Sequence, residues 1–324
     1  ITLDPDQVKA ILQFFDQTEQ VEGEVGLLEA MRLATTGDGT DLDGIEVESA
    51  EVDGWLNDVF ERLSQPENAG IPEIPTGLKG ELRPYQERGF GWLTQMQGMG
   101  LGACLADDMG LGKTPQTITL WLHEREQMDI KSPALLVCPT SVVGNWSHEL
   151  ARFAPSLRVM KHQNANRLKD EAFAKAVADV DVVLTSYALL HRDLETLQMV
   201  EWSSLVLDEA QNIKNPSTKQ AQAARTLTAG YKLALTGTPI ENRLSELWSI
   251  FQFLNPGYLG SQRAFKSTFS TPIERYGDEQ AAVTLKKLTA PFILRRLKTD
   301  SNIIQDLPEK FENKVYCSLT AEQA

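Results

Sequence analysis

The sequence predicts an α/β protein in which helices flank a parallel β-sheet. Short runs that are apolar on both faces alternate with longer stretches of helical periodicity, which is typical of strands buried in a parallel sheet. In chain order, the expected strands occupy residues 103–106, 134–138, 180–185, 204–207 and 233–236.

Apolar residues spaced three and four positions apart predict helices between these strands. They form three stripes: Ile118, Trp121 and Leu122; Trp146, Leu150 and Phe153; and Leu244, Leu247, Trp248, Phe251 and Leu254. We interpret the aromatic residues of these stripes as core packing and assign them no other role. Residues 261–290 also have a helical pattern, and we expect them to form a helical insertion outside the sheet near the C-terminus.

Composition narrows the possible classes of protein. A chain of 324 residues corresponds to roughly two domains, and 42% apolar with 23% charged residues is the balance of a globular protein with a core. No apolar run approaches the roughly 18 residues of a membrane span, which excludes an integral membrane protein. Three cysteines lie far apart (Cys104, Cys138 and Cys317), which excludes a disulfide scaffold and a cysteine zinc site and favours a cytoplasmic location.

The first quarter of the chain is strongly acidic. Residues 1–78 hold 18 acidic and 3 basic residues, a net charge of −15, whereas residues 79–324 have a net charge of +1. The nearly neutral remainder can carry a local basic groove but does not bind nucleic acid by bulk charge. In the acidic region we expect helices at 4–17 and near 24–34 and a strand within 45–52.

Prolines and glycines are dense between Ser64 and Gly80, which predicts a linker. The expected domains are an acidic accessory region with its linker (1–78), a sheet domain (79–260), and a helical protrusion with an outgoing segment (261–324). Because the chain begins with Ile1 and not with Met, we expect it to be part of a longer protein.

A candidate phosphate loop follows the first expected strand and opens a helical pattern. Residues 106–114 read ADDMGLGKT, in which Gly110 and Gly112 let the backbone approach an anion. Lys113 can reach the β- and γ-phosphates of a nucleotide, and the Thr114 hydroxyl can bind Mg²⁺. Asp107 stands where G-x-x-x-x-G-K-T has its first glycine, so the motif alone is also compatible with a turn that carries a surface lysine.

A pair of carboxylates follows a later strand. Asp208 and Glu209 come directly after an apolar run, at the edge where open α/β sheets bind ligands. Phosphoryl transfer needs one carboxylate to hold Mg²⁺ and another group to orient or deprotonate the attacking water. Asp208 suits the first role and Glu209 the second, although alone the pair is equally compatible with a solvated strand end.

Together these segments resemble the first RecA-like motor lobe of the Swi/Snf-type ATPases, in the DEAD/DEAH helicase superfamily. The resemblance runs from Leu82 to about Pro308, and Asp107 supports it because this family also has aspartate there. The segments that carry it are 82–86 (LRPYQ), 107–114 (DDMGLGKT), 138–141 (CPTS) with Asn145 and Trp146, 185–187 (TSY), 208–215 (DEAQNIKN), 235–242 (LTGTPIEN), 291–298 (PFILRRLK) and 307–308 (LP). The DEAQ form and the preceding extension indicate a bacterial member, which would be nucleoid-associated.

The resemblance implies ATP and Mg²⁺ as cofactors and assigns the site residues. Gln86 is expected to contact the nucleobase. Gln211 stands where many relatives have histidine, and we expect this change to retain activity because both side chains can form the same kind of hydrogen bond. The nucleotide-binding residues are then Arg83, Gln86, Met109, Gly110, Leu111, Gly112, Lys113, Thr114 and Pro115. The metal ligands are Thr114 and Asp208, and the catalytic residues are Lys113, Asp208, Glu209 and Gln211.

The resemblance also implies a second lobe whose arginines complete the ATP site. The chain ends at Ala324, where that lobe should begin. Arginine fingers contribute roughly 10³–10⁵ in rate in P-loop enzymes, so we expect this part alone to be nearly inactive.

The family moves along duplex DNA, and such a motor should hold phosphates without reading bases. The candidate contacts are Thr140, Ser141, Asn145, Thr185, Ser186, Lys214 and Asn242. Each also has a structural interpretation: Asn145 and Asn215 can cap helices, and Thr185 and Ser186 can end a strand. Arg295 and Arg296 can clamp the outgoing segment to acidic side chains.

The expected function is therefore an ATP hydrolase lobe of a duplex DNA translocase or remodeller of protein–DNA complexes. One alternative is a strand-separating helicase or RNA motor. Another is a nucleotide-gated interaction module whose acidic N-terminal region docks a protein or covers the DNA groove.

Overall fold

The computed structural model describes residues 28, 31–32, 40–42, 45–47, 70–238 and 243–300. Its centre is a seven-stranded sheet in the order β5-β6-β4-β7-β8-β3-β9, in which every pair of neighbours is parallel. The strands are β3 (Ala103–Leu105), β4 (Ala134–Cys138), β5 (Val159–Lys161), β6 (Val182–Ser186), β7 (Trp202–Asp208), β8 (Ala229–Leu235) and β9 (Ile293–Leu294). The predicted α/β class with a parallel sheet is confirmed.

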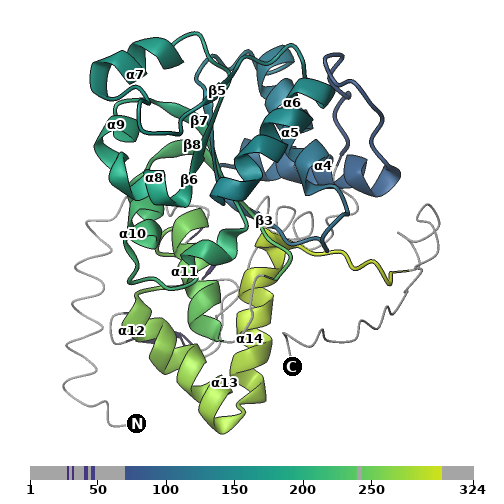
Figure 1. The fold of residues 1–324 in the computed structure, drawn as a ribbon. Helices are drawn as coiled ribbons and strands as arrows, with labels where there is room; N and C mark the ends of the chain where they lie inside the picture. The colour runs from purple at the N-terminus through teal and green to yellow at the C-terminus, as the bar shows by residue number, and fades with distance from the viewer. Residues whose placement is uncertain are drawn as a thin grey trace, which may run out of the picture.

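Helices cover both faces of this sheet (Figure 1). One face carries α4 (Pro84–Gly98), α5 (Lys113–Glu126) and α6 (Val143–Phe153). The other carries α7 (Asp170–Val177), α8 (Tyr187–Arg192), α9 (Leu194–Gln198) and α10 (Lys219–Thr226), with α11 (Leu244–Leu254) packed against α10 and β8. Short 3₁₀ turns at Thr140–Val142, Ala210–Ile213 and Ala290–Phe292 complete the connections.

The alternation of side chains along the strands explains the two hydrophobic layers. In β4, Leu136 joins the core with Trp121 and Trp146 beneath α5 and α6. Its neighbours Leu135 and Val137 face the opposite core beneath α8 and α10. All five residues of β4 are buried, as expected for a central strand of a sheet covered on both sides.

Each of the five predicted strands is present, but the two edge strands were not predicted. β5 has three residues that are exposed or half-buried, and β9 has two half-buried residues. Runs this short, with water on one side, lack the continuous apolar pattern on which the prediction depended.

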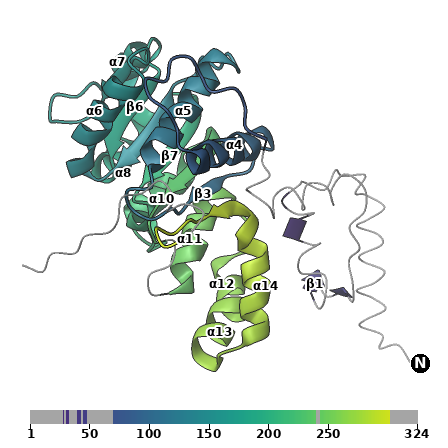
Figure 2. The same ribbon diagram turned by 90° about the vertical axis from the view of Figure 1, so that its right-hand side faces the viewer.

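The helical insertion predicted within 261–290 is confirmed. It consists of α12 (Gln262–Phe265), a π-helical turn (Lys266–Ser270), α13 (Thr271–Tyr276) and α14 (Glu279–Thr289). These helices project away from the sheet (Figure 2). The chain then returns to the sheet as β9, which pairs with β3 and brings residues 294–298 beside the candidate phosphate loop.

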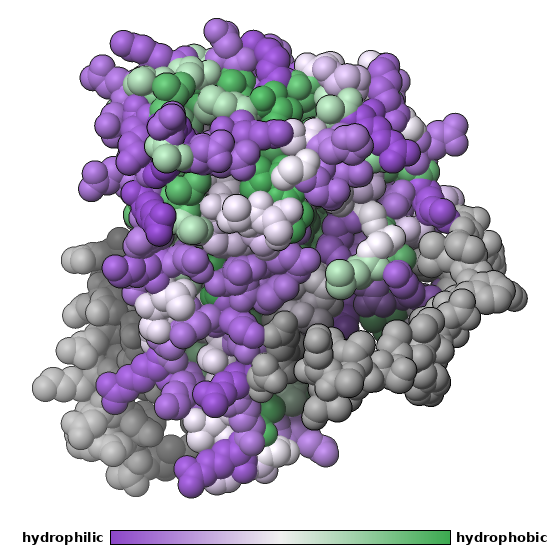
Figure 3. All heavy atoms as spheres, viewed as in Figure 1, coloured by the Kyte–Doolittle hydropathy of each residue, from purple (hydrophilic) through white to green (hydrophobic). Residues whose placement is uncertain are grey.

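In the acidic region, β1 (Thr40–Leu42) and β2 (Ile45–Val47) form an antiparallel pair, which agrees with the start of the expected strand. Residues 28, 31 and 32 are helical, within the second expected helix. The rest of these expectations, including the helix at 4–17, lies outside the described residues. No helix among the described segments is long and apolar enough to cross a membrane. On the face drawn in Figure 3, hydrophilic residues predominate, with apolar patches between them.

Candidate nucleotide-binding site

The predicted site segments meet at one edge of the sheet. Parallel strands all end at the same edge, and the phosphate loop follows β3 while Asp208 ends β7, with β8 between them. The segments that follow β4, β6, β8 and β9 reach this edge as well. The fold therefore brings together motifs that are far apart in the sequence.

The phosphate loop has the backbone that its glycines were expected to allow. Gly110 and Gly112 have φ values of 82° and 80°, in the left-handed region that residues with a Cβ rarely adopt. Gly112 precedes Lys113, the first residue of α5. A Cβ on Gly112 would lie 2.2 Å from Gln86 Nε2, so the loop also needs glycine here for space.

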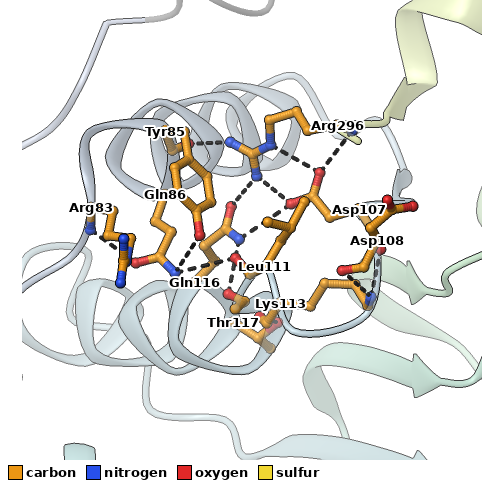
Figure 4. A network of polar contacts seen from close by, with 11 residues as sticks. Arg83, Tyr85, Gln86, Asp107, Asp108, Leu111, Lys113, Gln116, Thr117 and Arg296 are labelled. Carbon is orange, nitrogen blue, oxygen red and sulfur yellow. Dashed lines mark hydrogen bonds and ion pairs between the residues drawn. The ribbon is translucent and has the colours of Figure 1, made fainter. Parts of the chain in front are cut away.

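Lys113 turns its ammonium group into the loop. Its Nζ donates hydrogen bonds to the carbonyl oxygens of Asp107 at 2.6 Å and Asp108 at 3.5 Å (Figure 4). Thr114 and Pro115 lie half-buried in the first turn of α5, and Met109 is 73% exposed on the outer side of the loop. A bound phosphate can compete with these two backbone carbonyl oxygens for the Lys113 ammonium group.

Gln86 ties the start of α4 to the phosphate loop. Its Oε1 accepts the Arg83 backbone N–H at 2.9 Å, and its Nε2 donates to the Leu111 carbonyl oxygen at 3.2 Å. Gln86 is buried and Arg83 is half-buried. Nε2 also donates to the Tyr85 hydroxyl at 3.4 Å, so both of its N–H groups are engaged, and only Oε1 keeps a further accepting position for a nucleobase.

A buried ion pair joins the phosphate loop to the outgoing segment (Figure 4). Asp107 is 0% exposed, and its carboxylate accepts from the Arg296 backbone N–H at 3.1 Å and from Arg296 Nε at 2.9 Å. A second guanidinium nitrogen contacts Asp107 Oδ2 and donates to Gln116 Oε1 at 2.7 Å. The same side chain donates to the Tyr85 carbonyl oxygen and lies over the Tyr85 ring.

Arg296 therefore clamps the outgoing segment to an acidic side chain, as the sequence indicated for this arginine. Glycine at position 89 makes room for the pair, because a Cβ there would lie 1.9 Å from Gln116 Oε1. Sequence reasoning did not identify Gln116 as part of the site.

Asp208 is held by two aromatic donors. Trp146 Nε1 donates to Asp208 Oδ2 at 2.7 Å, and the Tyr187 hydroxyl donates to the Asp208 carbonyl oxygen at 2.8 Å. Burial raises the pKa of Asp208 above its ordinary value, while the Trp146 hydrogen bond and the positive charge of Lys113 act in the opposite direction.

Trp146 corrects the sequence interpretation. It was assigned to core packing alone, and it is indeed 1% exposed in the core. Its indole N–H nevertheless bonds to a predicted metal ligand, which the apolar pattern of α6 cannot reveal.

Glu209 adopts an unusual backbone conformation and begins a chain of hydrogen bonds. Its φ of 53° and ψ of 56° lie in the left-handed region, a local strain that often marks functional sites. Its Oε2 accepts from Gln211 Nε2 at 2.6 Å, and Gln211 Oε1 accepts from the Thr236 hydroxyl at 3.0 Å. Thr236 Oγ1 in turn accepts the Thr238 backbone N–H at 3.1 Å. Gln211 thus links the predicted water-activating carboxylate to the segment after β8.

The candidate DNA contacts differ in exposure. Thr140, Ser141 and Asn145 are exposed, and Lys214 is half-buried. Ser186 is buried at the end of β6. Asn242 lies outside the described residues.

Three of the structural interpretations of these polar residues can be judged. Thr185 is fully buried and donates to the His162 carbonyl oxygen at 3.1 Å, so its side chain serves the strand. Asn145 lies inside α6 rather than at its cap. The cap predicted at Asn215 is wrong, because Thr218 caps α10 and Asn215 forms a turn with Ser217.

The oxygen donors present suit Mg²⁺. A carboxylate on Asp208 and a hydroxyl on Thr114 are the hard ligands that this ion prefers, and phosphate oxygens and water normally supply the others. Within the described segments, no group of three or more His, Cys, Asp or Glu side chains could hold a metal ion.

Comparison with known proteins agrees with this geometry. Residues 85–324 match the family described as the SNF2-related domain. The chain is 43% identical to YwqA of Bacillus subtilis, whose name denotes an ATP-dependent helicase or translocase, over 100% of this chain and 36% of that protein. It is 36% identical to the human chromatin-remodeling ATPase INO80, over 78% of this chain and 17% of that protein.

A solved structure is also similar. The SWI2/SNF2 ATPase core of Sulfolobus solfataricus in complex with dsDNA has a TM-score of 0.68 and 49% sequence identity, covering 78% of this chain and 52% of that one. The chain thus spans about a third or less of the curated relatives and about half of the solved core.

Proposed function

Because the chain belongs to the SNF2-related domain family, we propose that it is the first ATPase lobe of a motor that hydrolyses ATP and moves along duplex DNA or remodels protein–DNA complexes. The resemblance to the Swi/Snf-type ATPases is confirmed by this membership. The Sulfolobus ATPase core, solved with double-stranded DNA, supports duplex DNA as the partner.

The residues divide the chemistry of phosphoryl transfer among them. The loop backbone around Gly110 and Gly112 and the Lys113 ammonium bind the phosphates. The Asp208 carboxylate and the Thr114 hydroxyl hold Mg²⁺, which when bound neutralises charge that develops on the β- and γ-phosphates.

Glu209 orients and deprotonates the attacking water. Gln211 holds the Glu209 carboxylate at 2.6 Å and ties it to Thr236, so that a displacement of the segment after β8 reaches Glu209, the catalytic base. Gln86 and Arg83 border the position of the nucleobase.

One observation carries this proposal. The phosphate loop and the Asp208–Glu209 pair lie at the same edge of the sheet, separated by the single strand β8. One nucleotide can therefore contact both. A lysine and a carboxylate at opposite ends of the sheet could not serve one triphosphate.

The family resemblance and the short share of each relative also support a second lobe in the full-length protein. Arginines from that lobe would face the γ-phosphate, and their contribution of roughly 10³–10⁵ in rate means that this chain alone turns over ATP slowly.

The test uses ATP hydrolysis by the full-length protein with and without duplex DNA. Lys113→Ala and Glu209→Gln should each abolish the DNA-stimulated rate, whereas Glu209→Gln should still bind ATP because its phosphate loop is intact. An exposed acid on α7 offers a matched control, since Glu171→Gln should leave the rate unchanged. An unchanged ATP hydrolysis rate in Glu209→Gln would contradict the assignment of Glu209 as the catalytic base.

The same assay separates the motor classes. Stimulation by duplex DNA that exceeds stimulation by single strands or RNA supports the translocase. The reverse order would favour the strand-separating helicase or RNA motor.

The acidic region suggests one more partner. Its net charge of −15 suits either docking of a protein or covering of a basic DNA groove. Deletion of residues 1–78 should then raise DNA affinity most at low salt. An unchanged salt dependence would argue against the covering of a groove.

A further inference from the structure

Two aromatic side chains converge on Asp208 from different parts of the fold. Trp146 comes from α6 and donates to the carboxylate at 2.7 Å, and Tyr187 comes from the start of α8 and donates to the Asp208 carbonyl oxygen at 2.8 Å. The Tyr187 hydroxyl also lies 3.4 Å from the Glu209 carbonyl oxygen. Both donors are buried, at 1% and 4% exposure, so water does not replace them.

Each donor directly follows a segment that is predicted to contact DNA. Trp146 is the neighbour of exposed Asn145, in the helix that follows Thr140 and Ser141. Tyr187 is the neighbour of Ser186, the last residue of β6. In both cases the neighbour of a predicted DNA contact bonds to Asp208, although Asn145 is exposed and Ser186 is buried.

The surroundings of Trp146 leave little room for independent movement. Its ring packs against Trp121 of α5 with centroids 5.9 Å apart, and α5 begins at Lys113 of the phosphate loop. A buried side chain in close packing moves with its helix rather than alone. A shift of α6 by a bound phosphate backbone therefore reaches Asp208 through the indole.

The other four described tryptophans show that this bond is not a general consequence of burying an indole, because buried Trp92 Nε1 has no hydrogen-bond partner and the other three bond to groups outside the site. Trp121 donates to the Ser204 hydroxyl, Trp202 to the Leu197 carbonyl oxygen and Trp248 to the Gly260 carbonyl oxygen. All three bonds stabilise the fold without contacting a predicted site residue. The Trp146 bond is directed at a group with a predicted catalytic role.

Tyr187 acts on the backbone of the same residue pair. Its hydroxyl bonds at the point where the chain leaves β7 and enters the left-handed conformation of Glu209. A hydrogen bond there helps to hold a conformation that residues other than glycine rarely adopt. The orientation of Glu209 thus depends on the residue that follows Ser186, a predicted DNA contact.

We propose that Trp146 and Tyr187 are positioning residues that transmit duplex DNA contact to the Asp208–Glu209 pair. The indole orients the Asp208 carboxylate for Mg²⁺, and the phenol holds the turn that aims Glu209 at water. DNA contact at 140–145 and at 186 tightens both bonds and so stimulates hydrolysis. This inference rests on the proposed function, because it specifies how that function is regulated.

The first experiment compares three conservative variants in the full-length protein. Trp146→Phe and Tyr187→Phe each remove one donor, and Trp202→Phe is a matched control that removes a buried indole bond to the Leu197 carbonyl oxygen instead. Outer-shell partners of metal ligands typically change metal affinity or activity about 10–100-fold. We expect Trp146→Phe to raise the Mg²⁺ concentration needed for half-maximal nucleotide binding about tenfold and to lower the DNA stimulation factor by a similar ratio.

Tyr187→Phe should lower the stimulation factor with a smaller effect on Mg²⁺, because its bond is to the backbone. Trp202→Phe should retain both properties. Equal losses in Trp146→Phe and Trp202→Phe would overturn the proposal, since they would reflect the loss of a buried indole in general. Duplex affinity, measured in parallel, should stay within a factor of three or so in all variants, because no mutated side chain is a predicted phosphate contact.

A second experiment observes the bond without hydrolysis. The chain is labelled with 5-fluorotryptophan, and its ¹⁹F spectrum is recorded as duplex DNA is added, with Trp146→Phe identifying the Trp146 signal. The Trp146 signal should shift while the Trp202 and Trp248 signals stay in place. A Trp146 signal that is unchanged by saturating duplex would overturn the proposal even if the variants lose activity.

The outcomes separate this inference from the proposed function. If the unmodified full-length protein hydrolyses ATP no faster with duplex DNA, the proposed function fails and this inference fails with it. If duplex DNA stimulates the unmodified protein and Trp146→Phe to the same degree, only this inference fails.

Discussion

Replacing Arg296 by methionine should destabilise the protein strongly, because it leaves a buried carboxylate without its cation. Asp107 is fully buried and receives both the Nε and a second nitrogen of this guanidinium. Without the side chain, Asp107 keeps the Arg296 backbone N–H at 3.1 Å and Gln116 Nε2 at 3.4 Å. Breaking one partner of a buried pair costs about 3–5 kcal/mol.

A loss of this size is easily measured. Urea unfolding followed by circular dichroism reports the free energy of unfolding. In thermal unfolding, the melting temperature of a domain of about 150–250 residues should fall by roughly 6–20 °C. The neighbouring exposed Arg295 is a matched control, and Arg295→Met should change stability by less than about 0.5 kcal/mol.

The reasoning also predicts a rescue. Asp107→Asn removes the unpaired charge, so the Arg296→Met and Asp107→Asn double variant should be more stable than Arg296→Met alone. If Arg296→Met unfolds at the same urea concentration as Arg295→Met, the buried pair does not clamp the phosphate loop as described.

Two further predictions concern Glu124, near the end of α5, and Gly112 of the phosphate loop. Burial raises the pKa of Glu124 from 4.5 to about 7. The protonated side chain therefore contributes its full stabilisation below pH 4.5, and the free energy of unfolding falls by about 3 kcal/mol as the pH rises through 7. Glu124→Gln should therefore flatten the decline of the unfolding free energy between pH 5 and 8, which exposed Glu171→Gln should not; an equal slope in both would contradict this. Gly112→Ala should destabilise the loop by at least about 1–2 kcal/mol and weaken nucleotide binding, because φ is 80° and the new Cβ would lie 2.2 Å from Gln86 Nε2. Gly98→Ala, where nothing lies within 4 Å, should be neutral or slightly stabilising in the same assays.

The central strands could be predicted because burial on both faces leaves an uninterrupted apolar run. β4 spans the predicted residues 134–138, and all five are buried. β5 and β9 could not be predicted, because such short segments are held by pairing with an existing sheet edge. Their own residues show too little apolar pattern to indicate a strand.

The candidate site divides in the same way. Lys113 and Asp208 were predictable since strand–loop–helix context and chemistry lie within a few residues of each other. The Asp107–Arg296 pair joins residues separated by 189 positions, and the Trp146–Asp208 bond spans 62. A tryptophan in an apolar stripe gives no sign of the acceptor that the fold brings to its N–H, so this contact required the structure.

The central claim is that the phosphate loop and the Asp208–Glu209 pair hold one nucleotide. A crystal structure of the chain with Mg²⁺ and a non-hydrolysable ATP analogue tests it most directly. The account predicts phosphate oxygens within hydrogen-bonding distance of Lys113 Nζ and a metal ion that bridges those phosphates and Asp208. A nucleotide bound elsewhere, or a metal ion that leaves Asp208 uncontacted, would contradict it.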